Sequence, residues 1–118
     1  MKVYLILFFI VVFNFSCAQM SSKPITEVSQ NEINSVILVD VRTPGEFKAG
    51  HLENAININW FDTDFSKQMT KIGKEETVYV YCKKGGRSAK AQQLLDSLGY
   101  KKVVNLEGGY DAWSANNK

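Results

Sequence analysis

The chain has 118 residues, of which 45% are hydrophobic and 22% are charged. This composition is that of a globular protein and excludes a disordered chain, and the length fits one domain. The formal net charge is +2, and it falls to 13 − 12 = +1 if the first sixteen residues, which hold one lysine and no acid, are removed. A nearly neutral net charge argues against a nucleic-acid-binding role, which would require a basic face.

The N-terminus reads as a secretory signal rather than as part of the fold. Met1 and Lys2 give a short basic start, residues 3–13 are wholly apolar or aromatic, and small residues follow. These eleven apolar residues are too few to span a bilayer, which takes ~20 residues. We therefore predict a signal peptide over residues 1–16 and leave it out of the fold.

Two processing sites fit the residues that follow the apolar stretch. Cys17 resembles the lipidated cysteine of a bacterial lipobox, from which the sequence departs at Asn14 and at the bulky Phe15. A cut after Ala18 would instead release a soluble exported protein that begins at Gln19. We favour the first site, because a cysteine directly after the apolar stretch has little other use there.

Lipidation of Cys17 predicts an exported, periplasmic lipoprotein that is anchored in a membrane. Residues 17–24 would form a polar tether, and residues 25–118 would form the domain. Cys82 is the only other cysteine of the chain. It would then be a lone thiol in a compartment where disulfides form, which indicates that the thiol has a role of its own.

Strands and helices are expected to alternate along the domain. Continuous apolar runs predict buried strands, and capping boxes or helical spacing predict helices. Strands are expected at residues 36–41, 55–58, 77–82 and 102–106, and helices after the capping boxes at 29–32 and 43–46, at 62–72, at 87–98 with Gly99 as its stop, and around 110–113. This alternation predicts an α/β fold, a parallel sheet with helices on both faces.

The sequence CKKGGRS carries the candidate chemistry. Cys82 ends a predicted strand, and parallel sheets bind their ligands at the carboxyl ends of strands. Gly85 and Gly86 permit turns in which successive N–H groups point inward, and the helix that begins at Arg87 adds its positive N-terminus. With the nearby cations, these features predict a lowered pKa and a nucleophilic thiolate. The anion-binding loop so defined comprises Lys83, Lys84, Gly85, Gly86, Arg87 and Ser88.

Three motifs, in this order along the chain, resemble those of the rhodanese-homology family. Residues 38–58, LVDVRTPGEFKAGHLENAINI, resemble its first signature, and residues 82–88 resemble its active-site loop. Residues 106–113, LEGGYDAW, resemble its C-terminal signature. The resemblance implies a single rhodanese domain with a five-stranded parallel sheet, without a metal or an organic cofactor, and we expect a monomer.

The resemblance also implies a reaction. Cys82 would attack the outer sulfur of a donor such as thiosulfate and become a persulfide, whose terminal sulfur the loop amides would hold. A thiophile, cyanide in an assay or a thiol in the cell, would then take this sulfur. The expected partners are therefore small sulfur-containing anions and thiol acceptors.

Arg87 and three residues outside the loop are expected to have structural roles. The guanidinium of Arg87 should tie loop carbonyls together. Asp40 and Arg42, which resemble family positions near the site, should form an orienting ion pair. His51, the only histidine, should make a structural hydrogen bond in a turn, and a catalytic Cys–His dyad is the alternative.

Two other functions are to be weighed against sulfur transfer. Phosphatases and arsenate reductases of this fold also use a cysteine, an amide cradle and an arginine, but their loop is one residue longer. Four residues separate Cys82 from Arg87, and this shorter cradle should exclude a tetrahedral oxyanion. The second alternative is a binding module or a persulfide carrier with little turnover. Inactive rhodanese domains often lack the cysteine, which is present here, whereas a carrier stays compatible with the sequence.

Overall fold

A computed structural model describes residues 20–117, and the predicted signal peptide and Cys17 lie outside these described residues. The described chain forms one five-stranded sheet in the order β1-β5-β4-β2-β3, in which all paired strands are parallel. The strands are β1 (Ser21–Pro24), β2 (Ile37–Asp40), β3 (Ile56–Asn57), β4 (Thr77–Tyr81) and β5 (Lys102–Glu107). The predicted parallel sheet of the α/β class is confirmed.

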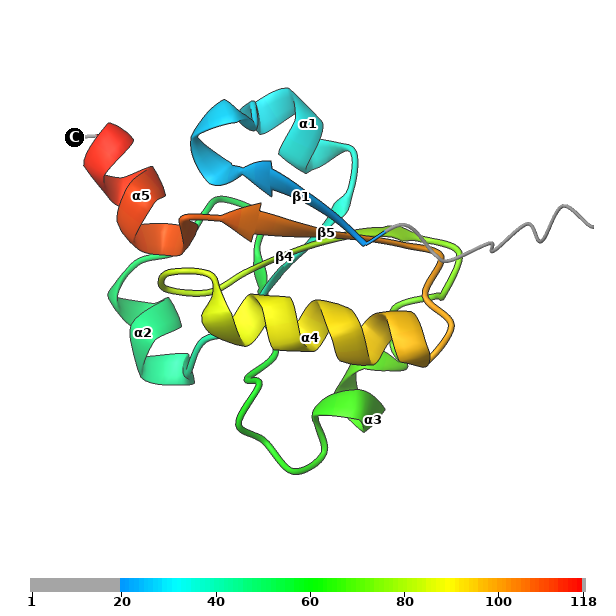
Figure 1. Ribbon diagram of the computed structural model, residues 1–118. Coiled ribbons are helices and arrows are strands. Elements are labelled where there is room, and N and C mark those ends of the chain that lie inside the picture. The colour runs from blue at the N-terminus through cyan, green and yellow to red at the C-terminus, as the bar shows by residue number, and fades with distance from the viewer. Residues whose placement is uncertain (1–19, 118) are drawn as a thin grey trace, which may run out of the picture.

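Helices cover both faces of the sheet (Figure 1). One face carries α3 (Phe65–Met69) and α4 (Gly86–Ser97), and the other carries the 3-10 turn η1 (Ile25–Glu27), α1 (Gln30–Asn34) and α5 (Gly109–Asn116). The short helix α2 (Pro44–Ala49) follows β2 at the end of the sheet where the loop between β4 and α4 also lies. Within residues 20–117, no helix is long and apolar enough to cross a membrane.

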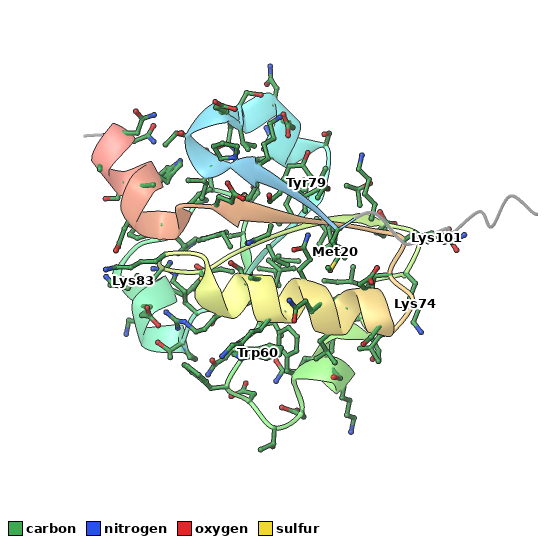
Figure 2. All side chains as sticks on the ribbon, viewed as in Figure 1. Met20, Trp60, Lys74, Tyr79, Lys83 and Lys101 are labelled. Carbon is green, nitrogen blue, oxygen red and sulfur yellow. The ribbon has the colours of Figure 1, made fainter. Side chains whose placement is uncertain are left out.

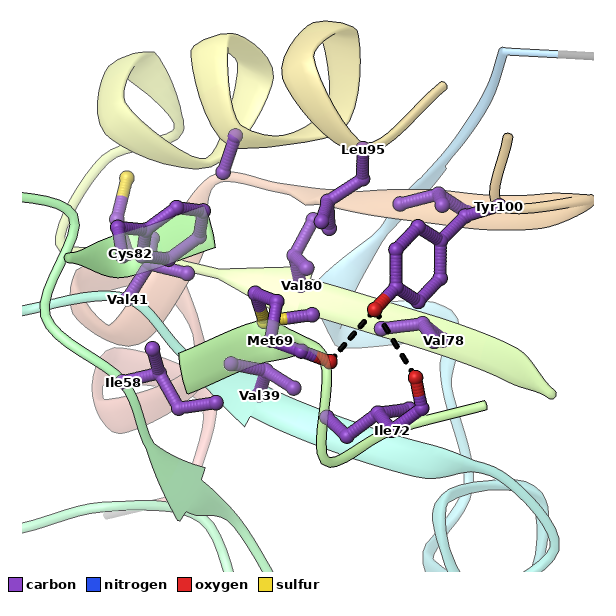
Figure 3. Close-up of a cluster of buried hydrophobic side chains, with 13 residues drawn as sticks. Val39, Val41, Ile58, Met69, Ile72, Val78, Val80, Cys82, Leu95 and Tyr100 are labelled. Atoms are coloured by element: carbon purple, nitrogen blue, oxygen red, sulfur yellow. Dashed lines mark hydrogen bonds between the residues drawn. The ribbon is translucent and has the colours of Figure 1, made fainter. Parts of the chain in front are cut away.

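A hydrophobic cluster on each face holds the helices on the sheet. On the α3–α4 face, Phe65, Met69 and Leu95 pack with strand residues, and Cys82 belongs to this cluster (Figure 3). At its far end, the hydroxyl of Tyr100 lies 2.5 Å from the carbonyl of Met69. On the opposite face, the buried residues are Ile25, Ile33, Leu38, Leu52, Tyr79, Tyr81, Val104 and Leu106. The thiol therefore lies at the edge of the hydrophobic core.

Side-chain caps begin the first two α-helices as predicted, with one difference. At α2 the capping box is complete, because the Thr43 hydroxyl accepts from the amide of Glu46 and the Glu46 carboxylate accepts from the amide of Thr43. At α1 only half of the box forms. The Ser29 hydroxyl accepts from the amide of Glu32 at 3.1 Å, but the Glu32 carboxylate accepts from a lysine of β1 and from the hydroxyl of Tyr79 instead.

The tether predicted before residue 25 is wrong in its last four residues, because these residues form β1. Ser21–Pro24 pair with β5 along one edge of the sheet. The strand has no apolar run to reveal it, and polar side chains fix it instead. The Ser22 hydroxyl donates to Glu107 at 2.6 Å, and Gln92 of α4 donates to the carbonyl of Ser21 at 2.6 Å. The domain thus includes Ser21–Pro24.

Helix α3 is shorter than the helix predicted over residues 62–72. Its N-cap residue, Asp64, makes no capping bond to the backbone. The carboxylates of Asp62 and Asp64 both accept from the side chain of Gln68, at 3.0 and 2.8 Å. Both side chains thus contact Gln68, and the helix runs only from Phe65 to Met69.

Candidate active site

Cys82 lies directly after β4, at the start of the loop that turns into α4. Its Sγ accepts a hydrogen bond from the backbone amide of Gly85 at 3.0 Å and one from the hydroxyl of Ser88 at 3.3 Å. Gly85 is the N-cap of α4 and has a φ of +118°, a left-handed conformation that favours glycine. The chain therefore folds back around the thiol, so that donors at the start of α4 point at the sulfur.

These donors favour the thiolate form of Cys82. The residue is only 1% exposed, and this burial by itself raises the pKa of the thiol. Hydrogen bonds from the Ser88 hydroxyl and from the amides of Ser88, Gly85 and Lys84 act in the opposite direction, and the pKa of Cys82 ends below its usual value. The direction agrees with the sequence-based expectation, and its main physical cause is hydrogen bonding.

Lys83 and Arg87 of the loop are paired with acids. The sequence predicted that these cations would act on the thiol and favour its thiolate form. Lys83 Nζ lies 3.2 Å from the carboxylate of Asp111 in α5, and both side chains are exposed. Figure 2 shows Lys83 at the outer end of the molecule. The guanidinium of Arg87 makes two hydrogen bonds to Glu46, at 2.7 and 3.0 Å. Backbone amides and one hydroxyl, more than cations, thus lower the pKa of the thiol.

The role predicted for Arg87 is wrong, because its guanidinium ties two helices together instead of binding loop carbonyls. Its partner, Glu46, belongs to the capping box of α2, and Arg87 belongs to the first turn of α4. The hydrogen bonds from Arg87, together with those from Thr43, lower the pKa of Glu46 to about 2 although partial burial opposes this shift. The pair therefore fixes the start of α4, and with it the closing end of the loop, against α2.

The loop carbonyls are held by the N-terminus of α5. The amide of Tyr110 donates to the carbonyl of Cys82 at 2.8 Å, and the amide of Asp111 donates to the carbonyl of Lys83 at 3.1 Å. Amides in the first turn of a helix have no acceptor within their own helix. The loop supplies these acceptors, so the loop and α5 complete each other's backbone hydrogen bonds.

Asp40 and Arg42 form a buried ion pair behind the site. Arg42 Nη2 lies 2.7 Å from Asp40 Oδ2 and also donates to the carbonyl of Gly50 at 2.7 Å. The guanidinium lies over the rings of Tyr110 and Tyr81, with centroid distances of 4.3 and 5.6 Å. The pair thus links the end of β2 to α5, which in turn holds the loop.

His51 makes a local contact beside α2. Its Nδ1 lies 2.8 Å from the carbonyl of Phe47, and the two rings stack with centroids 3.6 Å apart. In the described residues, His51 makes this contact and no hydrogen bond to Cys82. The arrangement is that of a structural histidine in a turn.

Glu46 and the first turn of α5 take part in the site although the sequence analysis gave them no such role. Glu46 had a sufficient explanation as a capping residue, and its partner Arg87 is 41 positions away. For Tyr110 and Asp111 a signal did exist. A second pair of glycines, at 108 and 109, follows β5 as Gly85 and Gly86 follow β4, which indicates another close backbone approach.

Comparisons with known proteins agree with this architecture. The family model "Rhodanese-like domain" matches residues 26–116. A sulfurtransferase of Allochromatium vinosum is 36% identical and the thiosulfate sulfurtransferase GlpE of Tolumonas auensis is 37% identical, each over 83 residues that cover 70% of this chain and 76% of the relative. A mitochondrial protein of Schizosaccharomyces pombe is 38% identical over 91 residues, and the alignment spans 64% of that protein, a little under two thirds.

Solved structures show the same fold. A rhodanese-related protein of Thermoplasma volcanium superposes with a TM-score of 0.71 at 28% identity, and a rhodanese-like domain protein of Staphylococcus aureus superposes with a TM-score of 0.70 at 34% identity. Each comparison covers 80% of this chain and 91% of the known structure. The matched family model, the fold and the cysteine loop after β4 together establish that the chain belongs to the rhodanese-like domain family.

Proposed function

We propose that the protein is a sulfurtransferase that carries sulfur as a persulfide on Cys82. The observation that carries this proposal is the thiol itself, which lies at the carboxyl end of β4 and accepts hydrogen bonds from Gly85 and Ser88. Relatives that are named sulfurtransferases support it. The proposed donors are small anions with a sulfane sulfur, such as thiosulfate, and the proposed acceptors are thiols.

In the first half of the reaction, the Cys82 thiolate attacks the outer sulfur of thiosulfate. A bond forms between Sγ and that sulfur, the bond between the two thiosulfate sulfurs breaks, and sulfite leaves with the electron pair. The charge of the thiolate thereby passes to sulfite. The Gly85 amide, which donates to Cys82 Sγ, and the other loop amides would stabilise the anionic outer sulfur of the persulfide.

In the second half, an acceptor thiolate or cyanide attacks the outer sulfur of the persulfide. The bond between the two persulfide sulfurs breaks, and Cys82 leaves with the electron pair as the thiolate that began the cycle. A low pKa of Cys82 helps both halves, because the same thiolate is the nucleophile in one and the leaving group in the other.

The test is a comparison of wild-type protein with Cys82→Ser. After incubation with thiosulfate, the wild-type peptide that contains Cys82 should gain the mass of one sulfur atom and lose it on addition of cyanide, with thiocyanate as product. The Cys82→Ser protein should be folded and inactive. Retained turnover in that variant would refute the proposal, and a wild-type protein that loads sulfur but does not turn over would identify it as a carrier.

The loop favours sulfur over a phosphate or arsenate group. The sulfur of Cys82 already accepts a hydrogen bond from the Gly85 amide, and only four residues lie between Cys82 and Arg87, the residue that closes the loop. The guanidinium of Arg87, which would bind an oxyanion in a phosphatase, is engaged by Glu46. Hydrolysis of a phosphate monoester by wild-type protein at a rate comparable to its sulfur transfer would contradict this preference.

We further propose that the protein is exported and held at a membrane by a lipid on Cys17, on the sequence of residues 1–17 alone. Stable anchoring takes more than one acyl chain, which a lipobox cysteine would carry. Cell fractionation and the mass of the mature N-terminal peptide test this. An unmodified N-terminus at Gln19 in the soluble exported fraction would refute the anchor and leave the proposed chemistry unaffected.

A further inference from the structure

Two backbone hydrogen bonds join the Cys82 loop to α5. The amides of Tyr110 and Asp111 donate to the carbonyls of Cys82 and Lys83 at 2.8 and 3.1 Å, while the first amide with an acceptor inside the helix is that of Ala112, at 3.3 Å. Outside the backbone, the ion pair between Lys83 and Asp111 spans the same contact. The helix start and the loop therefore meet through three separate interactions.

The direction of these bonds determines where the loop amides point. The carbonyl of one residue and the N–H of the next share one planar peptide unit, and in the trans form they point in opposite directions. All peptide bonds in residues 20–117 are trans. When α5 holds the carbonyls of Cys82 and Lys83, the amides of Lys83 and Lys84 must therefore point away from α5. These two peptide units lead directly into the next one, whose Gly85 amide donates to Cys82 Sγ at 3.0 Å, so the orientation set by α5 is passed on to a donor that contacts the thiol.

Gly109 is the residue that permits this approach. It has a φ of +62°, and a Cβ added there would overlap the carbonyl oxygens of Cys82 and Lys83. These are backbone atoms, so relief would require the loop or the helix to move. The absence of a side chain at Gly109 is thus a steric condition for both backbone hydrogen bonds.

The helix start is itself anchored to the rest of the site. The ring of Tyr110 lies under the guanidinium of Arg42, and a Cβ on Gly50 would overlap the Tyr110 hydroxyl. Arg42 is in turn held by Asp40 and by the carbonyl of Gly50. α5 therefore approaches the loop from a fixed position.

We propose that the N-terminus of α5 is a clamp that orients the peptide units of the Cys82 loop, and that Gly109 is the positioning residue that lets this clamp close. In this role Gly109 acts through the peptide units of the loop, which lead to the Gly85 amide that donates to Cys82 Sγ. An effect of Gly109 on the rate of turnover rests on the proposed sulfur transfer. An effect on the acidity of the Cys82 thiol does not depend on that proposal.

The test compares Gly109→Ala with Gly99→Ala. Both glycines are left-handed, with φ values of +62° and +92°, so alanine is conformationally unfavourable at either position. At Gly99 the nearest atoms to an added Cβ are those of the flexible Lys74 side chain, at 3.8 Å. The control thus carries a comparable backbone penalty without pressing on the loop. The charged groups of the loop and their ion-pair partners are the same in both variants, namely Lys83, Lys84, Arg87, Asp111 and Glu46.

The measurement is the rate at which iodoacetamide alkylates Cys82 as a function of pH, followed on the peptide that contains Cys82 because the chain has another cysteine, Cys17. Because Gly109→Ala should lose donors to the thiolate, the midpoint of its alkylation profile should rise by about one pH unit. At a pH below the midpoint, its alkylation rate should then be about tenfold lower than that of the wild type. Gly99→Ala should keep the wild-type midpoint. A wild-type midpoint in folded Gly109→Ala, checked by circular dichroism, would overturn the proposal.

Hydrogen exchange on the wild-type protein provides a second measurement that needs no variant. The amides of Tyr110 and Asp111 should be protected like that of Ala112, although first-turn amides have no acceptor in their own helix. Exchange of these two amides at the rate of an open chain would refute the clamp. If both measurements succeed while the wild-type protein transfers no sulfur, the clamp stands and the proposed function fails.

Discussion

Ser88 is the one side chain that donates a hydrogen bond to Cys82 among the described residues, and its single proton has two acceptors within reach. Its Oγ lies 3.3 Å from the sulfur and 3.1 Å from the carbonyl of Gly85. A thiolate is the stronger acceptor of the two because it is charged. Deprotonation of Cys82 should therefore draw the hydroxyl to the sulfur.

Ser88→Ala should raise the pKa of the Cys82 thiol, because the variant keeps the burial that disfavours the thiolate and loses a donor that favours it. We expect the midpoint of alkylation to rise by roughly one pH unit. Ser97→Ala is the matched control, since this exposed serine of the same helix bonds only to the carbonyl of Leu94. Equal alkylation profiles for the two variants would contradict the role of Ser88.

His51→Ala should lower stability without lowering the rate per folded molecule. The variant loses the hydrogen bond to the carbonyl of Phe47 and the stacking of the two rings, a loss of about 1 kcal/mol in the free energy of unfolding. Thermal unfolding and the sulfur-transfer rate measure the two effects. A rate loss of more than about a hundredfold at an unchanged melting temperature would instead make His51 a catalytic base.

Among the helices, α2 and α4 are joined at their first turns by the ion pair between Glu46 and Arg87. The pKa of Glu46 is about 2 in the folded protein, below its ordinary value of 4.5. A depressed carboxyl pKa stabilises the fold fully above the ordinary value, and this contribution is lost as the pH falls from about 5 towards 2. The free energy of unfolding at acidic pH therefore depends on this ion pair.

Glu46→Gln should lower the free energy of unfolding at pH 7 by on the order of 2 kcal/mol. Because the glutamine does not titrate, the difference from wild type should shrink as the pH falls from 5 to 2. Glu75→Gln is the control, since the pair of Glu75 with Lys101 is largely exposed and should contribute little. Urea unfolding at several pH values measures both variants, and a difference that is constant from pH 7 to 3 would disprove the linkage.

The elements that could be predicted from the sequence are those with a local cause. The apolar runs predicted β2, β4 and β5, and Thr43 predicted the cap of α2. β1 could not be predicted, because its residues are polar and its place is decided by an unpaired edge of β5, more than 80 positions away. Likewise, the loop glycines pointed to an amide cradle around Cys82, but the partner of Arg87 and the clamp by α5 depend on distant backbone.

For the molecule as a whole, the edge strand β1 extends the domain to Ser21. A chain that begins at Ile25 should unfold more easily than one that begins at Met20, because it loses the pairing of β1 with β5 and one of the two acceptors of the Gln92 side chain. We expect a loss of roughly 2 kcal/mol, or about 10 °C in the melting temperature. Equal melting temperatures would show that residues 21–24 behave as the tether that the sequence suggested.

The position of β1 also has a consequence for orientation at a bilayer. If Cys17 carries a lipid, the four residue steps to Ser21 allow at most about 14 Å of chain between the lipid and the sheet. A parallel sheet held so closely by the start of its edge strand would turn its amino end towards the membrane. Figure 2 shows Lys74 and Lys101 at this end and Lys83, beside Cys82, at the opposite one. Sulfur donors and acceptors would then reach the thiol from the aqueous side, and hydrophobic sulfur carriers dissolved in the lipid would not.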